Sequence, residues 1–162
     1  MDQSADLAAI PYSGRICAVD YGTVRIGWAI TDPAQSLVSP GEIYHRRTPA
    51  LDAGYFQQLS QQEQICGFIV GLPVHGNGQE SQKSREARQF AKWLGGLTSQ
   101  PVALHDERYT TRAAEEILRE SGLKASQRKK HLDKLAATVL LQSYLESRHQ
   151  PTHSPPPLED PS

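Results

Sequence analysis

The sequence predicts an α/β protein built on one mixed sheet, with helices on both faces of the sheet. Residues 15–20 and 25–31 are short apolar runs joined by the tight turn "YGTV", a pattern typical of a β-hairpin. Two later apolar runs are separated by helical segments, which is the spacing of parallel strands joined by right-handed crossovers. The 162 residues are enough for one domain with a single core.

The hairpin is followed by a third predicted strand, residues 38–45, which Pro40 and Gly41 interrupt. An antiparallel meander of three strands is therefore expected at the start of the sheet. The next element is a helix that begins at Thr48 and Pro49, because proline is favoured in the first helical turn. The apolar face of this helix is expected to contain Leu51, Tyr55, Phe56 and Leu59.

Strands and helices alternate in the second half of the chain. The run "ICGFIVGLP" is almost continuously apolar, as in a strand covered on both faces. After a glycine-rich loop, an amphipathic helix is predicted by apolar residues at i, i+3, i+4 and i+7, which are Ala87, Phe90, Ala91 and Leu94. The fifth strand is expected in "PVALHDER". A helix capped by Thr110 or Thr111 then ends at Gly122, and a last helix covers about 126–147.

The folded domain is expected to span residues 14–148. Residues 1–13 are predicted to be a flexible N-terminal segment. Residues 149–162 contain five prolines and almost nothing apolar, so this Pro-rich tail is predicted to be disordered. The sequence has no run of about 18 apolar residues, so no membrane span is predicted. Its N-terminus lacks the basic region of a signal peptide, so a cytoplasmic location is expected. Cys17 and Cys66 are expected to be reduced core residues.

The charge of the chain is unevenly distributed. The formal net charge is −1, but residues 15–148 alone carry 17 basic and 14 acidic residues. Residues 108–148 carry nine basic and five acidic residues. Such a local basic surface is compatible with a nucleic-acid partner, and equally with ordinary solvated helix faces.

Acidic residues at three places in the predicted fold are candidates for chemistry. Asp20 ends the first predicted strand, Asp106 and Glu107 end the fifth, and Asp133 lies on the last helix. The carboxyl ends of the strands are where an open α/β sheet collects its functional groups. Alanines follow Asp133 at i+3 and i+4, so this side of the helix is expected to pack closely against the sheet.

Three converging carboxylates would repel one another unless a cation lay between them. Hard oxygen ligands suit Mg²⁺ or Mn²⁺. In phosphodiester cleavage, such ions stabilise both the attacking and the leaving oxygen. The residues alone leave other interpretations open: Asp20 as a turn former, Asp106 and Glu107 as a solvated strand exit, and Asp133 as a partner of nearby lysines. The spacing by itself therefore indicates only a candidate metal site.

Four segments resemble, in order and spacing, the motifs of the YqgF family, the RuvX-type nucleases that are Holliday-junction-resolvase-like or act on pre-16S rRNA. They are "AVDYGTVRIGWAITDP", "IVGLPVHGNGQES", "DERYTTRAAEEIL" and "LDKLAATVLLQSYL". The resemblance covers about 15–146. It implies a ribonuclease H-like fold with a five-stranded mixed sheet, antiparallel in strands 1–3 and parallel in strands 4 and 5. It also implies a metal-dependent endonuclease that processes the 5′ end of precursor 16S rRNA in ribosome biogenesis.

Carried onto this sequence, the resemblance implies that Asp20, Glu107 and Asp133 are the catalytic residues and bind Mg²⁺ or Mn²⁺. Asp106 is a secondary fourth candidate. Gly22 and Gly71 are expected to be structural residues at the site. In the ribonuclease H strand order, the strand ending in "GLP" lies between those ending in Asp20 and Glu107, so a glycine there leaves room for the two carboxylates to converge.

Basic residues near these motifs are predicted to bind nucleic acid. The segment 75–88 is expected to be a loop that closes over a phosphate backbone, since flexible basic loops contact phosphates without reading bases. The alternative to a phosphate contact for Arg108, which follows Glu107, is an ion pair with Asp106 or Glu115. The predicted contacts are Arg25, Lys83, Arg85, Arg108, Lys129 and Lys130.

Alternative functions remain open at this point. The same metal chemistry would serve a Holliday junction resolvase acting on DNA. A non-catalytic ribosome-assembly or nucleic-acid-binding factor would keep the same fold. The stretch "AVDYGT…GWAI" is also similar to the first phosphate loop of actin-like ATPases and sugar kinases, which need two such domains. The expected partners are precursor rRNA, branched DNA and ribosomal particles, for a protein that is a monomer or homodimer without membrane contact.

Overall fold

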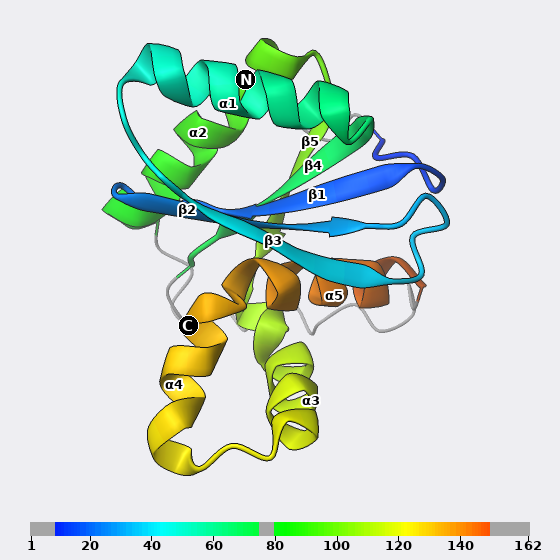
Figure 1. Cartoon of the computed structure of the whole chain (residues 1–162), viewed down its shortest axis with the longest axis vertical. Coiled ribbons are helices and arrows are strands. Elements are labelled where there is room, and N and C mark those ends of the chain that lie inside the picture. The colour runs from blue at the N-terminus through cyan, green and yellow to red at the C-terminus, as the bar shows by residue number, and fades with distance from the viewer. Residues whose placement is uncertain (1–8, 75–79, 150–162) are drawn as a thin grey trace, which may run out of the picture.

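The computed structural model describes residues 9–74 and 80–149. Its centre is a five-stranded sheet in the order β3-β2-β1-β4-β5 (Figure 1). β1 pairs antiparallel with β2, β2 pairs antiparallel with β3, and β4 and β5 continue the sheet in parallel. The predicted mixed sheet is thereby confirmed. The strands are β1 (Arg15–Asp20), β2 (Arg25–Thr31), β3 (Val38–His45), β4 (Ile65–Leu72) and β5 (Val102–Asp106).

Helices cover both faces of the sheet, as predicted (Figure 1). α1 (Pro49–Gln62) and α2 (Gln82–Thr98) pack on one face, and α5 (Ala136–His149) packs on the other. α3 (Thr111–Ser121) and α4 (Ala125–Lys134) extend beyond the sheet on the side of α5. Successive residues of β1 point to opposite faces, so the core on the side of α1 and α2 contains Cys17 and Val19, and the core on the side of α5 contains Ile16 and Ala18.

Local sequence signals explain several element ends. The Thr48 side chain accepts a hydrogen bond from the Leu51 backbone N–H and caps α1, whose first residue is Pro49. Ser81 and Ser84 cap α2 reciprocally. Gly122 ends α3 with a φ of 65°, a left-handed conformation that glycine adopts without steric cost.

Three predictions about where elements begin, end or are capped are wrong. The single last helix is two helices, α4 and α5, which meet at Leu135, where the backbone leaves the helical region at a φ of −107°. Neither predicted threonine caps α3: Thr111 is the first residue of the helix, and the Thr110 hydroxyl donates to the Glu107 backbone carbonyl. The fifth strand stops at Asp106, and residues 107–110 form a 3₁₀ turn.

The described N-terminal residues pack against the domain. Ile10 is 4% exposed and lies in the core on the side of α5. Arg148 donates hydrogen bonds to the backbone carbonyls of Ile10 and Pro11. The folded part therefore reaches back at least to Ile10, before the predicted start at residue 14. The rest of the predicted N-terminal segment, residues 1–8, and the predicted tail from residue 150 onwards lie outside the described residues.

The two cysteines are free thiols, as expected. Cys17 is fully buried, and Cys66 is half-buried. Within residues 9–74 and 80–149, no helix is long and apolar enough to cross a membrane.

Candidate functional site

Asp20, Glu107 and Asp133 lie around one pocket of about 390 Å³, which we call the acidic pocket. Asp20 is the last residue of β1, Glu107 is the first residue after β5, and Asp133 lies in the last turn of α4. The remaining walls come from the turn after β5, α3, α4 and α5, through Thr110, Ala114, Leu132, Ala136, Val139 and Leu140. The structure thus brings together the three acids that the sequence singled out.

Two acids of this pocket, Asp20 and Glu107, are largely removed from water, and the carboxylates repel one another. Burial, and then the neighbouring Asp133 carboxylate, raise the pKa of Asp20 above its ordinary value. Burial raises the pKa of Glu107 to about 7, with further contributions from Asp20 and Asp106 and an opposing one from Lys83. Asp20 therefore interacts electrostatically with both of the other acids.

The donor chemistry of the pocket fits a hard divalent cation. Three carboxylates supply oxygen ligands, and a cation would remove the repulsion between them. Among the described residues, none of the three carboxylates takes part in an ion pair. In the same part of the chain, no three His, Cys, Asp or Glu side chains are arranged as a complete metal site. Binding an ion therefore requires side-chain movement, for which the exposed Asp133 has the most freedom.

Gly71 lies directly beneath the Glu107 carboxylate. β4 stands between β1 and β5 in the sheet, as the ribonuclease H strand order predicts. A Cβ atom added to Gly71 would lie 2.7 Å from Glu107 Oε1 and 3.3 Å from Leu140 Cδ2. Gly71 was predicted to leave room for both the Asp20 and the Glu107 carboxylates, and this contact supports that role for Glu107.

Gly22 lies in the tight turn that follows Asp20. A Cβ atom added to Gly22 would lie 2.4 Å from the Arg25 backbone carbonyl oxygen. Any larger residue would therefore open the turn between β1 and β2. This geometry supports the predicted structural role of Gly22 next to the acidic pocket.

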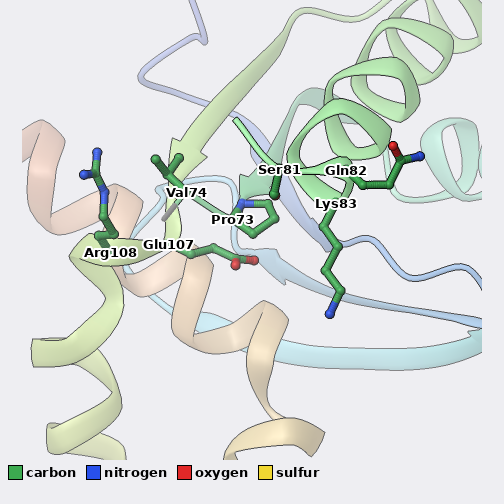
Figure 2. Close-up of a pocket in the computed structure, with 7 residues that line it drawn as sticks. All are labelled: Pro73, Val74, Ser81, Gln82, Lys83, Glu107 and Arg108. Atoms are coloured by element: carbon green, nitrogen blue, oxygen red, sulfur yellow. The ribbon is translucent and has the colours of Figure 1, made fainter. Parts of the chain in front are cut away.

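Asp106 and Arg108 form a close ion pair. The Asp106 carboxylate accepts hydrogen bonds from the Arg108 backbone N–H, at 2.9 Å, and from Arg108 Nε, at 3.0 and 2.9 Å. Both Asp106 oxygens therefore have a partner, which favours a role in orienting Arg108 over a role as a fourth metal ligand. Figure 2 shows the Arg108 side chain pointing away from Glu107.

Basic residues line two further pockets, one on each side of the three acids. A pocket of about 510 Å³ is lined by Glu107, Lys83 and Arg108 together with Pro73 (Figure 2); we call it the Lys83 pocket. On the other side, a pocket of about 760 Å³ contains Asp20 and Asp133, and we call it the Arg25 pocket. The basic residues of this second pocket are Arg25, Lys130 and Lys134.

Two other predicted nucleic-acid contacts lie apart from these pockets. Arg85 and Lys129 are exposed, on α2 and α4 respectively, and line neither of them. The segment 75–88 is not a loop throughout, because α2 already begins at Gln82; residues 75–79 lie outside the described part. Lys134 lines the Arg25 pocket but is not among the predicted contacts, since its place next to Asp133 in the sequence indicates an ion-pair partner.

A buried histidine anchors the turn that carries Glu107. Ser143 Oγ donates to the Tyr109 backbone carbonyl at 2.9 Å and lies 2.8 Å from His105 Nε2. Because the serine hydroxyl has one proton and gives it to Tyr109, His105 Nε2 must be the donor in the second bond. This pair ties β5 and the turn after it to α5. No sequence spacing signals a contact between residues so far apart in the chain.

The strand order, the two strand directions and the acids at the ends of β1 and β5 define the ribonuclease H-like class of folds. Residues 14–147 match the family described as "RuvX: Holliday junction resolvase". The chain belongs to the RuvX family.

Curated relatives agree with the family assignment, and a solved structure agrees with the fold class. The "Putative pre-16S rRNA nuclease" of Rhodopirellula baltica is 48% identical over 137 residues, which are 85% of this chain and 79% of the relative. The protein of the same name from Koribacter versatilis is 36% identical over 83% of this chain and 88% of the relative. Thermus thermophilus RuvC, in a complex with a Holliday junction, is similar with a TM-score of 0.59 at 14% identity, over 86% of this chain and 97% of RuvC. At that identity, the similarity to RuvC concerns the fold.

Proposed function

We propose that this protein is a divalent-metal-dependent endonuclease that processes the 5′ end of precursor 16S rRNA. The observation that carries the proposal is the acidic pocket, with Asp20, Glu107 and Asp133 around it and a basic-lined pocket on either side. Relatives that are 48% and 36% identical to this chain over their aligned residues carry the name "Putative pre-16S rRNA nuclease". A cytoplasmic site of action and association with ribosomal particles follow from that substrate.

The side chains have separate roles in this proposal. Asp20, Glu107 and Asp133 are the residues that would hold Mg²⁺ or Mn²⁺. A bound ion of this kind supplies a Lewis acid and lowers the pKa of water, so that no protein nucleophile is required. Lys83 on one side and Arg25 with Lys130 on the other bind the phosphates that flank the scissile bond, since cations on either side of an acidic centre guide a polyanion across it.

Incubation with two substrates tests the proposal. The full chain is incubated with end-labelled 16S precursor and with a four-way DNA junction, in Mg²⁺, in Mn²⁺ and in EDTA. We expect internal cleavage near the 5′ end of the precursor with either metal, and none in EDTA. Cleavage that persists in EDTA would contradict the metal-dependent mechanism, and release of single nucleotides would contradict endonuclease action.

A Holliday junction resolvase is the second candidate, because the family that matches residues 14–147 is described by that activity. Metal-dependent cleavage of the junction alone would replace the RNA proposal with this one. Binding of precursor without cleavage of either substrate would instead favour the non-catalytic assembly factor.

The basic residues on the two sides of the acids give a prediction about affinity. Lys83→Gln and Lys130→Gln are each expected to weaken RNA binding several-fold and to reduce the slope of log K against log salt by about 1, because each removes one phosphate contact. The measurement is fluorescence anisotropy with precursor RNA in EDTA across a salt series. Lys92→Gln is the matched control, since Lys92 is an exposed lysine of α2 that lines neither pocket. Unchanged slopes in both variants would contradict the proposed RNA path.

A further inference from the structure

One arginine outside the acidic pocket holds the turn that follows Asp20. Arg46 lies directly after β3. Its backbone N–H donates to the Val24 carbonyl at 2.9 Å, and its Nη1 donates to the Tyr21 hydroxyl at 3.1 Å and to the Gly22 carbonyl at 3.4 Å. The guanidinium also lies 5.4 Å from the centre of the Tyr21 ring. A single side chain and its backbone therefore contact most of the turn between β1 and β2.

Arg46 is itself oriented by a buried carboxylate. Asp52, in the first turn of α1, is 1% exposed. Its Oδ2 accepts from Arg46 Nε at 3.2 Å, and its Oδ1 accepts from the Tyr44 hydroxyl at 2.6 Å and from the Arg47 backbone N–H at 2.9 Å. Burial opposes the charge of Asp52, but these hydrogen bonds keep the pKa of its carboxyl below the ordinary value. The start of α1 thus fixes the direction of the Arg46 guanidinium.

Stability alone does not explain this arrangement. A buried ion pair contributes little net stability compared with apolar side chains of similar volume, because both charges lose their hydration. Arg46 is partly exposed, yet it directs its donors to the turn and to Asp52. The turn also contacts α2, since the centre of the Tyr21 ring lies 4.8 Å from that of the Phe90 ring. The turn is therefore held from two helices, through Asp52 and Arg46 at the start of α1 and through Phe90 of α2.

We propose that Arg46, oriented by Asp52, is a positioning residue for Asp20. It keeps the turn that begins at Tyr21 in one conformation, so that the Asp20 carboxyl stays directed into the acidic pocket. Ligand side chains held by surrounding hydrogen bonds lose less freedom when a metal binds, which is why such supporting residues affect affinity. The inference rests on the proposed metal-dependent function.

Replacing Arg46 by methionine tests the inference. Arg46→Met keeps a long side chain and removes the guanidinium donors. We expect the Mn²⁺ affinity, measured by electron paramagnetic resonance titration, to fall about 10- to 100-fold, as for other residues that support metal ligands. We expect kcat for RNA cleavage to fall with it, while KM for RNA changes by less than about twofold. Arg47→Met is the matched control: it removes the same charge from the adjacent, exposed arginine and is expected to bind Mn²⁺ like the wild type.

Further variants separate the alternatives. In Arg46→Met combined with Asp52→Asn, Mn²⁺ affinity is expected to be no lower than in Arg46→Met alone, because the two residues act as one unit. Wild-type Mn²⁺ affinity in Arg46→Met would overturn the positioning role. A raised KM for RNA without loss of Mn²⁺ affinity would also overturn it, because that result would indicate a substrate contact.

A second variant applies if Arg46→Met does not fold. Tyr21→Phe removes a single hydrogen bond between Arg46 and the turn and is expected to lower Mn²⁺ affinity a few-fold; unchanged Mn²⁺ affinity in Tyr21→Phe would overturn the inference. Failure of the wild type to bind Mn²⁺ would overturn the proposed function as well.

Discussion

Replacing Asp20 by asparagine is expected to reduce cleavage of precursor RNA by about a thousand-fold or more. Asp20 is the acid that is electrostatically coupled to both Glu107 and Asp133, so its loss removes the central ligand of the proposed ion. Metal catalysis contributes several kcal/mol of transition-state stabilisation, and each 1.4 kcal/mol or so corresponds to a factor of ten in rate. The measurement is the single-turnover cleavage rate in Mg²⁺ and in Mn²⁺.

The same substitution is expected to leave the fold intact. Burial and Asp133 raise the pKa of Asp20 in the folded protein above its unfolded value. A carboxyl whose pKa is higher in the folded than in the unfolded protein is ionised at a pH above both of these values, and its ionised form then destabilises the folded state. Asparagine has nearly the same shape without the charge. The Tm of Asp20→Asn in EDTA should therefore equal or exceed that of the wild type, and RNA affinity in EDTA should not decrease.

A matched control separates the role of Asp20 from a general effect of lost charge. Glu120→Gln makes the same kind of change at an exposed position near the end of α3, away from the acidic pocket, and is expected to cleave RNA at the wild-type rate. Wild-type cleavage by Asp20→Asn would exclude Asp20 as a metal ligand. A large fall in Tm would show that the carboxylate supports the fold instead.

Residues 15–72 show why much of the fold could be predicted from the sequence. β1 and β4 are buried on both faces, so their apolar runs are nearly continuous, and the tight turn at Gly22 marks the hairpin between β1 and β2. Thr48 and Pro49 mark the start of α1 through local capping geometry. These signals lie within a few residues of the feature that they predict.

The wrong predictions depend on contacts between distant segments. Leu135 carries no helix-breaking side chain, yet the chain bends there between α4 and α5. Leu51 has the periodicity of a core residue but is 52% exposed. The Thr110 hydroxyl makes a hydrogen bond within the 3₁₀ turn instead of capping α3. That turn is tied to α5 by the distant pair of His105 and Ser143. Such features are decided by tertiary packing, which overrides local preference.

The candidate site also has features that the sequence predicts and features that depend on tertiary structure. The placement of Asp20 and Glu107 was predictable because they lie at the carboxyl ends of β1 and β5, and these ends meet at one edge of the sheet. The space that Gly71 leaves beside Glu107 was predictable from the strand order that the family resemblance implies. The network of Arg46 and Asp52 carries no motif of its own, because its meaning depends on the three-dimensional position of the turn after Asp20.

Replacing Gly71 by valine is expected to lower the cleavage rate about a hundred-fold, the order of loss that a displacement of about 1 Å produces in a catalytic group. The added Cβ atom would lie 2.7 Å from Glu107 Oε1, so the Glu107 carboxylate must leave its place over β4. Filling a packed site in this way also costs about 1–3 kcal/mol of the free energy of unfolding. The measurements are the single-turnover cleavage rate, Mn²⁺ affinity and urea-induced unfolding.

Gly67→Val is the matched control, because Gly67 lies on the same strand and the same face as Gly71. A Cβ atom there would meet Ile10 at 3.0 Å instead of a catalytic side chain. Both variants are therefore expected to lose stability, but only Gly71→Val should lose Mn²⁺ affinity and most of its cleavage rate. Equal activity losses in the two variants would mean that Gly71 serves packing alone. Full activity in Gly71→Val would mean that Glu107 functions from another position, and the space above Gly71 would then have no part in assembling the site.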